Sequence, residues 1–428
     1  MKKSLLAMVA LSAVAGVAQA DVSLYGVLDM GIANLTAGQN ANATMPVGVP
    51  TQIIPSNTAG KSVTTLAPNG LSQSVLGFKG AEDISGDLKA GFILEAGINP
   101  NSGTITDGLS GLTQGNANTS SGADSSRAGQ LFNNRSTLYL SSKEWGTLSF
   151  GRQYTVSLDD IVKYDPQQAS YAFSVVGFFG SYGGGGWTED ARLDNSVKYN
   201  ATFHNVRVGA LYQFGGIAGN NTANSAGQFG LGTDIGKLSM DAFVSYKKDG
   251  MGTAAAGGTP SVPALKAIVS DTKAAGLFAK YTMGPATISG GVEHILYTNP
   301  TGGAAASGYV SPLGGYTYTT FVTNGYNINK VLNLGFAGVR YAVTPALDIS
   351  GSFYTVHQLD YSGTGCSTTA AATCSGYLQA YALVADYHLS QRTDVYAGIS
   401  PTSVNGGMSV GFAATENTTT MVGVRHRF

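Results

Sequence analysis

Apolar and polar residues alternate with a period of two along most of the chain, a pattern that predicts β-strands with one apolar and one polar face. In the stretch 22–32, Leu24 and Leu28 fall on one face, and Tyr25 and Asp29 fall on the other. Sixteen such segments occur, at 22–32, 72–80, 88–98, 132–142, 147–153, 194–200, 206–214, 227–234, 237–246, 272–282, 285–297, 331–342, 346–357, 377–388, 392–400 and 418–428. The pattern therefore predicts an all-β chain.

The connections between these segments alternate between short and long. The long ones are rich in Gly, Ala, Ser, Thr and Asn, and lie at 33–71, 99–131, 154–193, 215–226, 247–271, 298–330, 358–376 and 401–417. Eight long loops would be unusual in a compact soluble domain. Barrels of the bacterial outer membrane, however, combine short periplasmic turns, long extracellular loops and an even strand number. We therefore expect a 16-stranded antiparallel transmembrane β-barrel.

Such a barrel must close, because backbone groups in hydrocarbon cannot be left unpaired. We thus expect segment 418–428 to pair with the first strand. Sixteen strands enclose a water-filled lumen, whereas eight leave room only for side chains. In the last segment Val424 and Phe428 share one face, and Arg425 and Arg427 share the other. Phe428 is predicted to lie at the membrane boundary and to act as a signal for the barrel-assembly machinery.

Composition supports export to a membrane rather than a soluble role. Charged residues make up 11% of the chain, and the N-terminus combines Lys2 and Lys3, an apolar stretch at 4–17 and an Ala-Gln-Ala sequence at 18–20. These features predict a secretory signal at 1–20 and one barrel domain at 21–428. Without the signal, 22 basic residues would stand against 25 acidic ones. This balance argues against a nucleic-acid partner.

Two cysteines, Cys366 and Cys374, lie eight positions apart in a predicted surface loop. In an exported protein such a pair favours a disulfide over two free thiols. A metal site is disfavoured because His357 is the one histidine nearby, which leaves too few ligands.

The sequence does not favour catalysis. The histidines are His204, His294, His357, His388 and His426, and none is accompanied by a convincing nucleophile with an orienting carboxylate. The glycine run 183–186 lacks the Lys-Ser/Thr of a phosphate loop. We expect no enzyme activity, no cofactor and no metal.

Six segments together resemble one known family. They are VSLYGVLD at 22–29, LGFKGAED at 76–83, LKAGF at 88–92, GRQY at 151–154, NSVKY at 195–199 and VGVRHRF at 422–428. In these segments the chain is similar to the trimeric Gram-negative general porins, most closely their beta-proteobacterial branch. The resemblance spans nearly the whole chain beyond residue 20. It implies a homotrimer in which each protomer has its own pore.

The resemblance also implies that the third long loop, 154–193, folds into the barrel and faces basic side chains on the wall. The acids of this loop are Asp159, Asp160, Asp165, Glu189 and Asp190, and the candidate wall residues are Lys79, Lys89, Arg135, Arg152, Arg192 and Lys198. Strict alternation from Phe150 would turn Arg152 towards lipid, so the strand must bulge or end at Gly151 for Arg152 to reach the lumen. Val75 and Ile93 replace an arginine and a polar residue usual in the family, which thins the basic wall.

The expected function is passive diffusion of ions and small hydrophilic solutes across the outer membrane of a Gram-negative bacterium. The alternative is a substrate-specific channel for small anions or organic acids. The expected surroundings are outer-membrane lipid and lipopolysaccharide.

Overall fold

A computed structural model describes residues 22–37, 61–105, 131–178, 191–216, 218–253, 264–301, 317–366, 373–409 and 414–428. The predicted signal at 1–20 and the loop acids Glu189 and Asp190 lie outside these residues. Within them, no helix is long and apolar enough to cross a membrane.

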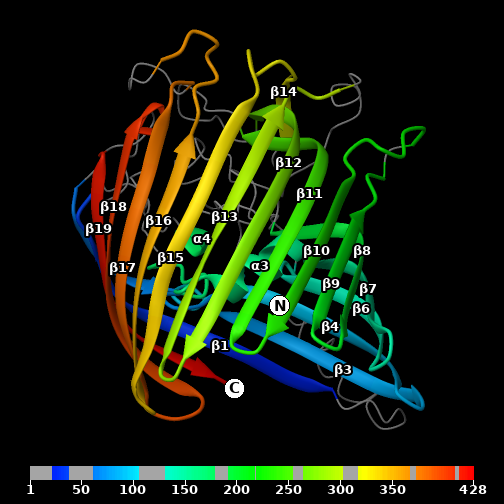
Figure 1. Ribbon diagram of the computed structural model, residues 1–428, viewed down its shortest axis with the longest axis vertical. Coiled ribbons are helices and arrows are strands. Elements are labelled where there is room, and N and C mark those ends of the chain that lie inside the picture. Colours follow the sequence, from blue (N-terminus) through cyan, green and yellow to red (C-terminus); the bar gives the residue numbers. More distant parts are fainter. Residues whose placement is uncertain are drawn as a thin grey trace.

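Sixteen long strands form the wall of a closed antiparallel barrel (Figure 1). They are β1 (Ser23–Leu35), β3 (Val75–Ser85), β4 (Leu88–Asn99), β6 (Arg135–Ser142), β7 (Gly146–Tyr154), β8 (Arg192–Phe203), β9 (Val206–Gln213), β10 (Ala226–Ile235), β11 (Leu238–Thr253), β12 (Ala264–Met283), β13 (Ala286–Thr298), β15 (Lys330–Thr344), β16 (Leu347–Gln358), β17 (Gly376–His388), β18 (Thr393–Gly406) and β19 (Glu416–Arg427). The predicted strand number and barrel class are confirmed.

Three short strands lie in the long connections and were not predicted: β2 (Val63–Pro68), β5 (Thr104–Ile105) and β14 (Thr317–Val322). The described helices are α3 (Val156–Tyr164), α4 (Val175–Phe178) and a 3-10 turn, η3 (Gly407–Ser409). β14 pairs with β12 in parallel, unlike the antiparallel wall.

The barrel closes between its first and last strands. β1 pairs antiparallel with β19, from Val27 opposite Arg427 to Leu35 opposite Thr419. Beyond this ladder, the backbone of Gly26 exchanges two hydrogen bonds of 3.0 Å with that of Phe428. No edge is therefore left at this seam, as the bilayer requires.

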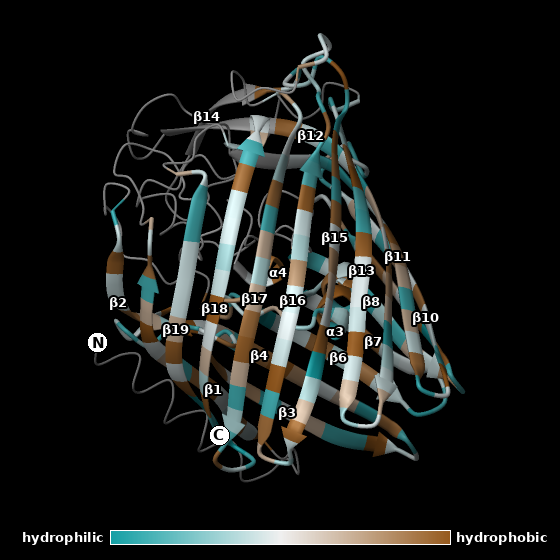
Figure 2. Ribbon diagram, turned by 60° about the vertical axis from the view of Figure 1, so that its left-hand side comes forward, coloured by the Kyte–Doolittle hydropathy of each residue, from teal (hydrophilic) through white to brown (hydrophobic). Residues whose placement is uncertain are grey.

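The outer face of the wall is apolar, as the alternation predicted. Leu24 is 56% exposed, and Ile32 and Leu138 are each 63% exposed. Apolar positions recur along the long strands in Figure 2, interleaved with polar ones. This pattern suits a wall that meets lipid outside and water inside.

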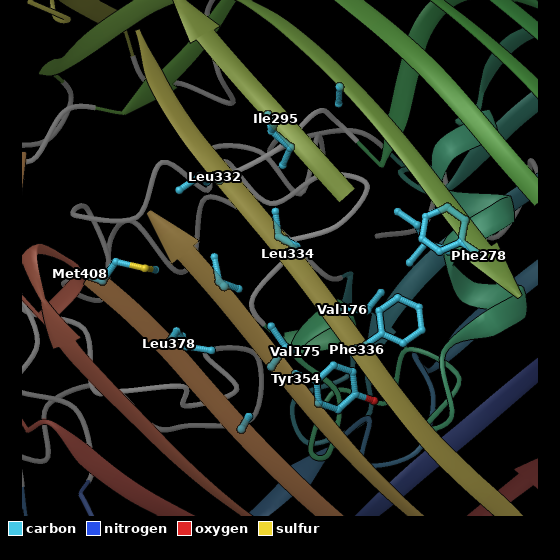
Figure 3. Packing of buried hydrophobic residues seen from close by; sticks show 14 of the residues in the cluster. Val175, Val176, Phe278, Ile295, Leu332, Leu334, Phe336, Tyr354, Leu378 and Met408 are labelled. Atoms are coloured by element: carbon cyan, nitrogen blue, oxygen red, sulfur yellow. The ribbon is translucent and has the colours of Figure 1, made fainter. Parts of the chain in front are cut away.

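Part of the inner face is also apolar, because a loop packs on it. Inward side chains of β11 to β18 form one buried cluster with α3 and α4 (Figure 3). Phe278 stacks on Phe243 and Phe336 with ring centroids 5.9 and 6.1 Å apart, and Phe336 lies 6.1 Å from Tyr354. The lumen is therefore filled by protein on this side.

Candidate functional site

The connection after β7 enters the barrel through helix α3. Thr155 caps the helix, since its side chain accepts a hydrogen bond from the Leu158 amide. Asp159 lies in the first turn and Lys163 in the last, an arrangement that suits the helix dipole. α3 contacts β9 to β13, and in Figure 1 it lies inside the barrel about halfway along the strands. We call residues 155–178 of this connection the constriction loop.

A buried carboxylate on the wall anchors the end of α3. Asp241 of β11, 3% exposed, accepts a hydrogen bond of 2.7 Å from Lys163 Nζ and one of 2.6 Å from the Tyr164 hydroxyl. Arg207 of β9 approaches the same carboxylate at 3.0 Å. The Tyr164 ring stacks on Phe278 at 6.0 Å. The helix is thus held by charge and by apolar packing together.

Asp165 does not face the opening, so its predicted role as a pore acid is wrong. Its carboxylate is buried and accepts hydrogen bonds from Ser174 Oγ at 2.5 Å, the Ala169 amide at 2.6 Å and the Tyr354 hydroxyl. Burial raises the pKa of Asp165, while these donors oppose the rise. The residue anchors the loop to β16.

Among the loop acids in the described residues, Asp159 and Asp160 are the nearest to the predicted basic wall. Asp159, about half exposed, pairs with Lys198 of β8, which also donates to the Tyr154 carbonyl at 2.9 Å. Lys198 itself is buried. Burial, followed by the nearby carboxylates of Asp241 and Asp159, raises the pKa of Asp160 to about 8. Asp160 is therefore mostly protonated at neutral pH.

Two of the predicted wall arginines meet on one tyrosine ring. The guanidinium groups of Arg135 and Arg192 each lie 5.1 Å from the centre of the Tyr154 ring. Arg135 also pairs with Glu95 of β4 at 3.3 Å, and Glu95 accepts hydrogen bonds of 2.8 Å from the hydroxyls of Tyr154 and Tyr25. We call these five residues the Glu95 cluster.

The two remaining wall lysines lie at different levels. Lys79 of β3 is exposed and sits over the Tyr25 ring at 5.3 Å, next to the Glu95 cluster. Lys89 pairs with Asp83 at 2.8 Å beside the short turn between β3 and β4. Lys89 is six residues from Glu95 along an extended strand, about 20 Å away. Lys89 therefore lies outside the constriction.

Arg152 follows the predicted bulge but does not reach the opening. Gly151 has φ +112°, and the register between β7 and β8 shifts between Gly151 and Gln153. The Arg152 side chain, 7% exposed, donates to Asp194 at 2.5 Å and to the Asn133 carbonyl at 2.6 Å. Its charge is therefore engaged within the wall rather than displayed to the lumen.

Sequence reasoning missed the acidic partners on the wall. Alternation along β4 does not say that Glu95 lies against Arg135 and Tyr154. Asp241 and Arg207 were not singled out either. Their positions depend on which strands stand next to α3, which a single sequence does not give.

A second charged cluster lies on β15 to β19. Arg425 donates to Asp386 at 3.2 Å and to Asp394 at 2.8 Å, and Arg340 donates to Asp348 at 2.8 Å. Asp386, His388 and Asp394 could place ligand atoms within 4.8 Å of one another. Since Arg425 already binds both carboxylates, we assign no metal to this cluster.

The two remaining predicted positions lie at opposite ends of the barrel. A disulfide joins Cys366 and Cys374 in the long connection between β16 and β17. Phe428 lies at the end of the closing seam described above, and its role as an assembly signal stays a prediction.

Comparison with known proteins then identifies the family. A model of the Gram-negative porin family matches residues 7–407. The chain belongs to the Gram-negative porins. This porin is 28% identical to outer membrane porin protein 32 of Delftia acidovorans over 323 residues, covering 74% of this chain and 77% of the relative. It is 26% identical to an outer membrane porin protein of Bordetella pertussis over the full length of both chains.

Solved structures share the fold of this porin. An anion-selective porin from Comamonas acidovorans superposes with a TM-score of 0.62 at 20% identity, covering 96% of this chain and all of that one. A loop-deletion mutant of OmpT from Vibrio cholerae gives 0.61 at 15% identity, with 96% and 99% coverage. Family and fold agree, so the protein is an outer-membrane porin channel and not an enzyme, as the sequence predicted.

Proposed function

We propose that this porin conducts ions and small hydrophilic solutes by passive diffusion, through a gap between the constriction loop and the wall that carries the Glu95 cluster. The observation behind the proposal is the position of α3. It is docked against β9 to β13, while Arg135, Lys79 and Glu95 lie on β3 to β6. A loop that fills one side of the lumen leaves a narrowed passage beside the other.

Charge across such a gap supports passage of hydrated solutes. Charges on low-dielectric walls focus the field and raise the local concentration of counter-ions. Asp159 lies on the loop side, half exposed, and Arg135 lies on the wall side, about a third exposed. Charged and polar solutes gain from this field, whereas apolar solutes lose by entering it.

A substrate-specific channel for small anions or organic acids is the alternative. The feature that favours it is the pair Arg135 and Arg192 on Tyr154, because guanidinium groups bind carboxylates in bidentate fashion. A solved structure of the same fold is described as anion-selective. Single-channel current in planar bilayers separates the two. Current that rises in proportion to solute concentration supports a general pore, and current that saturates with one anion supports a binding channel.

Replacing Arg135 tests the position of the passage. We expect Arg135→Ala to shift the reversal potential in a salt gradient towards cation permeability. Removing one charge about 4 Å from a passing ion in water changes its energy by about 1 kcal/mol, so the permeability ratio changes by up to about fivefold. Lys89→Ala is the matched control, because it removes a charge about 20 Å along the wall. Equal shifts in the two variants would contradict a constriction at Glu95.

The porin is also proposed to act as a homotrimer in outer-membrane lipid and lipopolysaccharide. OmpT of Vibrio cholerae, which has the same fold with a TM-score of 0.57, is described in a trimer form. The outward apolar side chains of this chain can pack against lipid or against a second copy of the chain. Chemical cross-linking of detergent-solubilised protein is expected to give a ladder ending at three copies, and a ladder ending at one or two would refute the trimer.

A further inference from the structure

One buried carboxylate on β1 organises a second part of the constriction loop. Asp29 of β1 is 0% exposed. Its Oδ2 accepts hydrogen bonds of 2.8 Å from the amides of Leu71 and Ser72, and its Oδ1 accepts from the Gly70 amide at 3.1 Å and from the Tyr396 hydroxyl at 2.6 Å. Four donors on one carboxylate compensate its burial and fix the backbone at 70–72.

The segment held in this way is clamped from both ends. The Asn69 amide donates to the Asp29 carbonyl at 2.8 Å, and the Asp29 amide donates to Ser74 Oγ at 3.0 Å. Within the segment the Ser74 amide donates to Asn69 Oδ1 at 2.7 Å. Gly70 has no room for a side chain, since a Cβ there would lie 1.9 Å from the Tyr396 hydroxyl oxygen. The segment can therefore lie this close to β18 only with glycine at 70.

The same segment holds the constriction loop on its other side. The Gly70 carbonyl accepts a hydrogen bond of 3.1 Å from the Ala172 amide and one of 2.6 Å from Ser170 Oγ. The Phe173 ring packs edge-on against Tyr396, with centroids 6.4 Å apart. Ala172, Phe173, Leu71 and Tyr396 belong to one buried apolar cluster. Asp29 and residues 170–173 thus contact opposite sides of the same turn.

This contact matters because a cleft lies nearby between the loop and the wall of the barrel. We call residues 166–178 the far arm of the constriction loop. At its start, Pro166, Gln167 and Gln168 line a polar cleft whose other walls include Arg340, Asp348 and Asp386. The contacts of α3 with Asp241 lie before the far arm in the chain. Within the arm, Asp165 accepts hydrogen bonds from Ala169 and Ser174, and the Gly70 carbonyl adds a second anchor at residues 170 and 172.

We propose that Asp29 is a positioning residue of the pore, which fixes the far arm of the constriction loop through the backbone of residues 70–72. Asp29, Gly70, Leu71, Ser72 and Tyr396 form the Asp29 latch. The inference rests on the proposed function, in that the loop it positions borders the passage. Asp29 itself touches no solute, and it acts on the width and steadiness of the gap.

Three variants interrupt the latch at different links. Asp29→Asn replaces one acceptor oxygen by a donor, Tyr396→Phe removes the hydroxyl donor, and Ser170→Ala removes a bond on the loop side without changing charge. Each is expected to raise open-channel current noise several-fold and to lower the voltage at which the channel closes. Ser170→Ala should leave the reversal potential unchanged. Because the links act in series, Asp29→Asn combined with Ser170→Ala should behave like Asp29→Asn alone.

The matched control is Asp87→Asn. Asp87 also accepts a hydroxyl and an amide, from Ser142 at 2.5 Å and Lys143 at 2.7 Å, but it lies at a short turn away from the loop. Asp87→Asn should leave the open-channel current noise at the wild-type level. Noise unchanged in all three latch variants, or effects that add in the double variant, would overturn the proposal.

A measurement that needs no current separates the latch from the proposed function. A spin label on Gln168→Cys, whose native side chain is exposed, reports the mobility of the far arm. Its spectrum should sharpen when Asp29→Asn or Ser170→Ala is added, and an unchanged spectrum would refute the latch. If the wild type carries no current while the spectra sharpen, the proposed function fails and the latch stands. If Asp29→Asn does not fold, Ser170→Ala still decides.

Discussion

At the scale of single residues, the charged side chains of the lumen are arranged as close pairs rather than as open rows. Lys198 is paired with Asp159, Arg135 with Glu95, and Lys163 with Asp241. A pair whose two charges are close produces a weaker field at a distance than either charge alone. The net charge of the passage therefore depends on the residues that titrate, and Asp160 is one of them.

Asp160 predicts a pH-dependent selectivity. Since its pKa is raised to about 8, its carboxyl is largely neutral at pH 6 and largely charged at pH 10. We expect the permeability of cations relative to anions to rise over this interval, most steeply near pH 8. Reversal potentials in a salt gradient, measured from pH 6 to 10, give the curve. The stability of the fold should depend on pH through the same carboxyl. Because the pKa of Asp160 is higher in the folded state, the contribution of Asp160 to stability falls as the pH rises from about 4 to 8.

The control for this titration is Asp160→Asn, which keeps the shape of the side chain. The variant should hold the low-pH selectivity across the whole interval, while Asp159, Asp241, Lys163 and Lys198 remain beside it. A variant that still changes selectivity near pH 8 would assign the titration to another group.

At the scale of elements, strands were more predictable than the loop that enters the barrel. Alternation found all sixteen long strands, because one face of each meets lipid and the other meets water or the packed loop. It placed the start of β12 at 272 rather than Ala264, since apolar residues fall on both faces over 264–271. The three short strands form within connections whose composition is typical of loops, so alternation did not predict them.

In the constriction loop, local sequence signals predict the structure only in part. Thr155 as a cap and Asp159 in the first turn are helix signals at the start of α3, but the alternation predicts only one long loop over 154–193. The bulge at Gly151 follows from the family resemblance taken together with the alternation, but the contacts of Arg152 do not. The direction of Arg152 depends on Asp194 of β8 and on the Asn133 carbonyl, which precedes β6. Partners across strands cannot be deduced from alternation, and most of the site consists of such partners.

At the scale of the whole molecule, the barrel depends on the seam between β1 and β19. Gly31 lies opposite Gly423 in this ladder, and a Cβ on Gly31 would lie 2.3 Å from the Val422 carbonyl oxygen. Backbone atoms there cannot rotate aside as a side chain could. Any residue larger than glycine at position 31 must therefore push the two strands apart.

Substitution of this glycine tests whether closure limits stability. We expect Gly31→Ala to lower the free energy of unfolding by about 1–3 kcal/mol, the usual cost of overpacking, as measured by urea titration in detergent. Gly351→Ala on β16 is the control, since a Cβ there would meet only the Ala382 carbonyl oxygen, at 3.9 Å. It should unfold at nearly the wild-type urea concentration. Because an open seam exposes unpaired amides to lipid, Gly31→Ala should also insert into membranes less efficiently than Gly351→Ala, and equal insertion and equal stability of the two variants would show that another part of the wall limits closure.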